Sequence, residues 1–121
     1  MRSLPEEPDI RQLAGRKVEC DQQGFLLNAD DWDEAIAEAL AVEEGIALGD
    51  DHWAVIQYMR DYLEEHSVAP DARHVFSYLA GRKNLKKRAA REFFFELFPF
   101  GYVKQACRIA GMRQPRAWST G

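Results

Sequence analysis

Residues 97–112 read LFPFGYVKQACRIAGM. This stretch predicts where one helix ends and which residues form the next one. Pro99 has no backbone N–H and cannot continue a helix that runs through the phenylalanines before it. The segment 102–110 is predicted to form a short final helix. Gly111 fits the position just past its end, where a left-handed backbone closes a helix. Residues 112–121 show no hydrophobic period, so we expect a flexible C-terminal arm.

Helical signals continue upstream of this stretch. Residues with capping side chains precede apolar positions at helical spacing, which predicts helices over about 31–44 and 51–66. Pro70 opens a third helix that ends near Gly81, and it makes the second and third helices a tight pair. A fourth helix runs up to Phe98.

A basic run and a group of aromatic residues share this fourth helix. The cations are Lys83, Lys86, Lys87, Arg88 and Arg91, and four phenylalanines follow between positions 93 and 98. Cations that contact phosphates beside aromatic rings that stack on bases would suit a nucleic acid. The helical spacing of the phenylalanines favours a buried helix face instead. A helix-turn-helix built from the second and third helices offers only Arg73 as a candidate reading side chain.

The N-terminal part of the chain predicts one short β-hairpin. Residues 16–20 alternate polar and apolar side chains, 21–24 favour a turn, and 25–27 supply a second strand. Cys20 lies on the apolar face of the first strand, so we expect a buried thiol there. Residues 1–14 contain prolines among acids and are predicted to be a flexible leader.

The 121 residues, with 46% hydrophobic and 12% aromatic content, suffice for one core. We therefore predict a mostly α (α+β) domain over residues 15–111: a bundle of about five helices with an N-terminal β-hairpin and a flexible C-terminal arm over 112–121. No stretch reaches the roughly 20 apolar residues of a membrane span, and no signal sequence is seen. The expected location is the cytoplasm.

Charge is divided unevenly along the chain. Residues 1–72 contain 5 Lys/Arg against 18 Asp/Glu, whereas residues 73–121 contain 11 against 2. The acidic and basic parts of such a chain can attract each other. The basic part can also attract an acidic protein surface or a nucleic acid.

Several kinds of site are excluded by spacing. No glycine-rich phosphate loop is present. His52, His66 and His74 do not fall four residues apart, and they are interpreted as surface or capping residues. Cys20 and Cys107 form no CxxC motif and no disulfide framework. We expect no metal and no cofactor.

Cys107 is the candidate reactive residue. It lies between Lys104 and Arg108, ahead of an arm that bears Arg113 and Arg116. Nearby positive charge stabilises the thiolate, which is the form that attacks sulfur. The alternative is an inert cysteine packed against the phenylalanines.

Several segments together resemble the DsrC/TusE family. They are DQQGFL at 21–26, Trp32, EGIALGDDHWAVIQYMRDY at 44–62, Pro70 with Arg73, and LFPFGYVKQACRIAGM at 97–112. The resemblance runs from about residue 15 to residue 116. It implies a small, mostly helical protein with an N-terminal hairpin and a mobile arm, which handles protein-bound sulfur and does not turn over a small substrate.

The resemblance also implies where sulfur is carried. Family members serve either dissimilatory sulfite reductase or the relay that makes 2-thiouridine in tRNA, and their carrier cysteine is the penultimate residue of the arm. DsrC-type members have a second cysteine eleven residues earlier. Cys107 matches this inner cysteine, but Trp118 stands eleven residues later and Thr120 is penultimate. Neither side chain can form a persulfide.

Three functions are compatible with the sequence, the first two differing in how they account for this departure and the third resting on the second and third helices and the basic run. In the first, Cys107 accepts persulfide sulfur or forms a mixed disulfide with a partner. In the second, the chain is a non-transferring adaptor or regulator, and in the third, ranked last, a DNA-binding regulator. The expected partners are a sulfurtransferase, a sulfite-reductase-like complex or a tRNA-thiolation enzyme. The residues assigned to partner or arm binding are Lys104, Arg108, Arg113, Arg116, Trp118 and Arg73.

Overall fold

A computed structural model describes residues 8–114 of the chain. Its elements in order are β1 (Asp9–Leu13), β2 (Arg16–Cys20), the 3-10 helix η1 (Ala29–Asp31), α1 (Glu34–Glu44), α2 (Asp50–His66), α3 (Ala72–Lys83), α4 (Lys87–Leu97) and the π-helical segment η2 (Tyr102–Cys107). The predicted mostly helical bundle with an N-terminal β-hairpin is confirmed. No helix within the described residues is long and apolar enough to cross a membrane.

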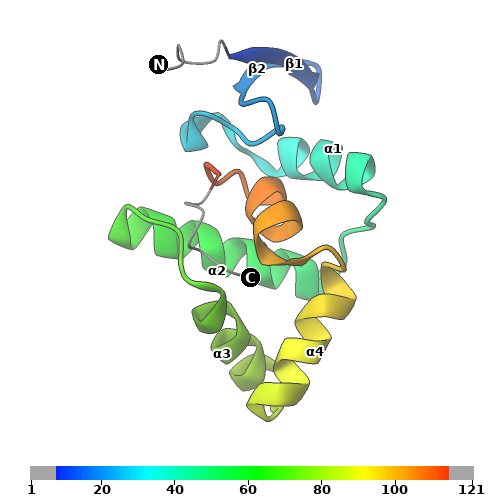
Figure 1. Cartoon of the computed structure of the whole chain (residues 1–121), viewed down its shortest axis with the longest axis vertical. Helices are drawn as coiled ribbons and strands as arrows, with labels where there is room; N and C mark the ends of the chain where they lie inside the picture. Colours follow the sequence, from blue (N-terminus) through cyan, green and yellow to red (C-terminus); the bar gives the residue numbers. More distant parts are fainter. Residues whose placement is uncertain (1–7, 115–121) are drawn as a thin grey trace, which may run out of the picture.

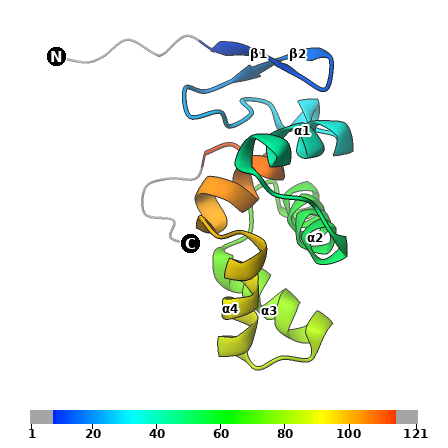
Figure 2. The same ribbon diagram turned by 90° about the vertical axis from the view of Figure 1, so that its right-hand side faces the viewer.

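The elements are arranged around η2. Figures 1 and 2 place η2, coloured orange, between α1 and α2, with the hairpin beyond α1. The α3–α4 pair extends to the opposite end of the molecule (Figure 1). The segment that contains Cys107 therefore lies inside the fold.

The hairpin differs from the one expected. β2 pairs antiparallel with β1, from Asp9 opposite Cys20 to Leu13 opposite Arg16. The leader expected over 1–14 was therefore wrong for residues 9–13. The expected strand 25–27 was also wrong, because only an isolated bridge joins Cys20 to Leu26.

The turn predicted at 21–24 is present. The Asp21 carboxylate accepts hydrogen bonds from the backbone N–H groups of Gln23 and Phe25, at 2.9 and 3.0 Å. Such a short-range carboxylate contact stabilises a turn in place of a strand. Cys20 is fully buried, as predicted.

Capping groups set the helix starts. α1 begins three residues later than predicted, because the Asn28 side chain first caps η1 and Asp33 then accepts the Ile36 N–H at 2.9 Å. At α2, His52 Nδ1 accepts the N–H of Gly49 at 3.1 Å, while Nε2 donates to the Leu97 carbonyl at 2.9 Å. The capping role expected for this histidine is confirmed, and it also ties α2 to the end of α4.

The phenylalanines of α4 belong to the core, as predicted. Phe94 and Phe98 are fully buried, with ring centroids 5.3 Å apart. The ring of Phe76, from α3, meets Phe94 edge-on at 5.2 Å. These contacts join α3, α4 and the turn that leads into η2.

Candidate functional site

Cys107 ends η2 and has no exposed surface. Burial raises the pKa of its thiol to about 12, because a thiolate loses its hydration inside the core. A hydrogen bond with Tyr102 lowers this pKa by a smaller amount. At neutral pH the group is therefore a thiol, and it is poorly suited to attack sulfur.

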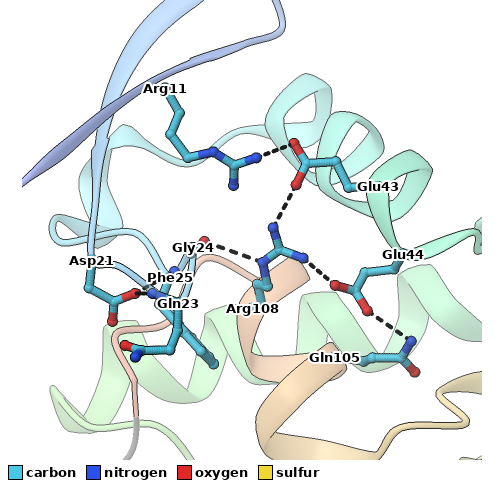
Figure 3. A network of polar contacts seen from close by, with 9 residues as sticks. All are labelled: Arg11, Asp21, Gln23, Gly24, Phe25, Glu43, Glu44, Gln105 and Arg108. Carbon is cyan, nitrogen blue, oxygen red and sulfur yellow. Dashed lines mark hydrogen bonds and ion pairs between the residues drawn. The ribbon is translucent and has the colours of Figure 1, made fainter.

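The cations beside Cys107 in sequence do not activate it. The Arg108 guanidinium reaches toward α1 and the loop before η1, where it contacts Glu43 and the Gly24 carbonyl (Figure 3). Lys104 is exposed on η2. The expectation that positive charge lowers the pKa of this cysteine was wrong, because burial dominates.

Arg108 instead holds a network that also contains Arg11, Glu43, Glu44 and Gln105 (Figure 3). Its guanidinium pairs with Glu43 at 2.6 Å and with Glu44, and its Nε donates to the carbonyl of Gly24 at 3.3 Å. Arg11 of β1 pairs with Glu43 at 2.6 Å. This Arg108 network therefore joins the hairpin, the loop before η1, α1 and η2.

Gln105 completes the network from η2. Its Nε2 donates to Glu44 at 3.0 Å, and its Oε1 accepts the N–H of Phe100 at 2.8 Å. Burial raises the pKa of Glu43, but hydrogen bonds from Arg11 and Arg108 outweigh it, so the net pKa is lowered. The network therefore favours a charged carboxylate at this position.

A second set of contacts fixes the point where the chain leaves η2. The indole Nε1 of Trp32 donates to the Ile109 carbonyl at 2.8 Å, and Arg60 donates to the Ala110 carbonyl at 3.1 Å. The Arg60 guanidinium lies 4.4 Å from the centre of the Trp32 ring. Gly111 then turns the chain with a φ of 75°, which confirms its predicted place after the last helix. These contacts set the direction in which the arm begins.

Two other predicted site residues, Arg113 and Arg73, are exposed, whereas the thiol is buried. Arg113 is exposed directly after the buried Met112. The Arg73 side chain is 90% exposed at the start of α3, and it lies 4.0 Å from Asp71. Arg116 and Trp118 lie outside the described residues. Sequence reasoning missed Arg11 and Glu43 as functional candidates, because no spacing in the sequence links them.

A groove of about 470 Å³ lies beside the start of the arm. Phe25, Phe100 and Val103 give it apolar surface, and it reaches Gln114 at the end of the described chain. No cluster of three potential metal ligands occurs within residues 8–114. The site therefore offers a contact surface, and its one thiol is closed to solvent.

Comparison with known proteins gives consistent matches. The profile of a family described as DsrC like protein matches residues 12–117. Sulfurtransferase TusE of Yersinia pseudotuberculosis is 38% identical over 104 residues, covering 86% of this chain and 95% of that protein. TusE of Escherichia coli K12 is 35% identical over 101 residues, covering 84% and 92%. The structure is similar to the oxidized gamma-subunit of the dissimilatory sulfite reductase (DsrC) from Archaeoglobus fulgidus, with a TM-score of 0.78, 35% identity and coverage of 91% and 98%.

Proposed function

This chain belongs to the DsrC/TusE family, and on that premise we propose that it is a sulfur-relay protein that acts as a non-transferring adaptor or regulator. The observation that carries this proposal is the state of Cys107, which has no exposed surface and a pKa raised to about 12. A sulfur carrier needs a thiolate that a partner's sulfur can reach.

The sequence supports the same proposal. Cys20, the other cysteine of the chain, is also fully buried. Trp118 stands where the family resemblance implies a carrier cysteine, and an indole cannot form a persulfide. An acceptor role for Cys107 would require η2 to open, which would break the contacts of Arg108 and Trp32.

The similar proteins suggest which partners to test. One group bears the name sulfurtransferase TusE, and the other is a subunit of dissimilatory sulfite reductase. Both names favour a protein partner. We propose that the chain binds a sulfurtransferase, a sulfite-reductase-like complex or a tRNA-thiolation enzyme in place of a sulfur-carrying relative.

Intact-mass spectrometry after incubation with a persulfide-charged sulfurtransferase tests the missing transfer. We expect no gain of sulfur by this chain, while a two-cysteine DsrC in the same reaction gains it. The reason is that the Cys107 thiol is buried and protonated. A sulfur adduct that disappears in Cys107→Ser would instead make this cysteine a working acceptor and would refute the proposal.

Trp118 is proposed to anchor the arm in a partner, because interface tryptophans often carry a large share of binding energy. We expect this chain to compete with a two-cysteine DsrC for dissimilatory sulfite reductase, as measured by surface plasmon resonance. Trp118→Ala should weaken that competition about tenfold, and Trp118→Phe should weaken it less. If the parent and Trp118→Ala compete equally well, Trp118 does not contribute to the interface.

A further inference from the structure

A group of exposed cations begins at the turn between α3 and α4 and continues into the first five residues of α4. They are Lys86, Lys87, Arg88 and Arg91, named here the basic tip. The turn lies at the end of the molecule opposite the hairpin (Figure 1). The basic tip is therefore separate from η2 and from the start of the arm.

Most of the charge in the basic tip is free of partners within the described chain. The neighbouring cations Arg82 and Lys83 both pair with Asp51, at 3.0 and 3.3 Å. Of the basic tip itself, only Arg88 has an ion pair within residues 8–114, to Glu92 at 4.0 Å, and both side chains are largely exposed. Such a long exposed pair contributes little.

The positive charges of the basic tip destabilise the start of α4. The first turn of α4 contains no acidic residue, although acids stabilise the positive end of a helix dipole. Lys87 and Arg91 lie four residues apart, where like charges repel. Binding to an external anionic surface would relieve both effects.

We propose that the basic tip is a docking surface for an acidic patch on a protein partner. The inference deepens the proposed adaptor function by naming a contact surface, but it rests on charge and exposure and not on Cys107. The aromatic rings of α4 are poorly placed to stack on bases. Phe94 is fully buried, and the half-buried rings of Phe93 and Phe95 already lie under cations, 5.5 Å from Lys83 Nζ and 5.6 Å from the Arg91 guanidinium carbon. An extended nucleic acid that ran beyond the basic tip would be repelled by the strongly acidic N-terminal 72 residues, whereas a local acidic patch on a protein contacts the tip alone.

The probe is a fluorescently labelled peptide of alternating glutamate and aspartate, with binding measured by anisotropy at low and moderate salt. Lys87→Glu is compared with Lys17→Glu, which makes the same change of net charge at an exposed position on β2. We expect Lys87→Glu to weaken binding about fivefold and Lys17→Glu to leave it nearly unchanged. Added salt should weaken binding by the parent.

Three results would overturn the assignment. They are no measurable binding by the parent, an equal loss in both variants, and tighter binding of a single-stranded oligonucleotide of equal charge. The last would assign the basic tip to a nucleic acid. Circular dichroism checks that each variant is folded, and Arg91→Gln supplies a second tip variant. None of these results bears on the sulfur-loading test, so the two proposals fail independently.

Discussion

Arg108→Ala will lower the free energy of unfolding by about 3 kcal/mol, because it leaves the mostly buried Glu44 carboxylate without a cation and leaves Glu43 with Arg11 alone. The Arg108 side chain is 12% exposed and that of Glu44 is 17% exposed. The substitution also removes the donor to the Gly24 carbonyl. Urea unfolding followed by circular dichroism measures the loss.

Lys104→Ala is the matched control, because Lys104 lies on the same segment but is exposed. We expect it to unfold at the same urea concentration as the parent protein. Arg108→Lys should recover part of the loss, since it keeps the charge but cannot reach several acceptors with one planar group. Equal midpoints for Arg108→Ala and the parent would show that the network contributes nothing to stability.

The same network predicts a pH signature. Burial raises the pKa of Glu43, but Arg11 and Arg108 together lower it by more, so its folded value lies below the ordinary carboxyl value. A group with a lowered folded pKa contributes stability above its unfolded pKa, about 4.3, and loses it as the pH falls through the folded value. In Arg108→Ala, this loss of stability on the acid side should be smaller than in the parent.

The sequence predicted the helices well where capping is local. The second helix was expected over 51–66 and is found at Asp50–His66, because the capping contact of His52 involves residues only three apart. β1 was missed because DIRQL lacks clear alternation. Its position depends on pairing with β2 and on the contact between Arg11 and Glu43, which are 32 residues apart.

The protonation state of the Cys107 thiol depends on contacts between residues far apart in the chain, which the sequence alone does not reveal. Lys104 and Arg108 flank Cys107 in the chain, which suggested an activated thiolate. In the fold, Arg108 pairs with acids more than 60 residues away, on α1. Sequence neighbours on a helical segment point in different directions, so adjacency in the chain did not place the charge beside the sulfur.

Gly111→Ala will destabilise the protein by about 3 kcal/mol and will disturb the start of the arm. Its φ of 75° is a conformation that residues with a Cβ adopt at a cost. A Cβ built there would lie 2.6 Å from Trp32 Cγ and 2.7 Å from Trp32 Cβ. The Trp32 side chain cannot move aside easily, because its indole N–H donates to the Ile109 carbonyl and its ring packs against Arg60.

Gly81→Ala separates this effect from the general response to replacing a glycine. Gly81 lies in α3, and a Cβ added there would meet no atom within 4 Å. We expect it to raise the free energy of unfolding by about 0.5 to 1 kcal/mol, because alanine favours the helix. Thermal unfolding of both variants measures the contrast. A Gly111→Ala protein as stable as the parent would mean that Trp32 does not hold the chain where it leaves η2, and that the direction of the arm is set elsewhere.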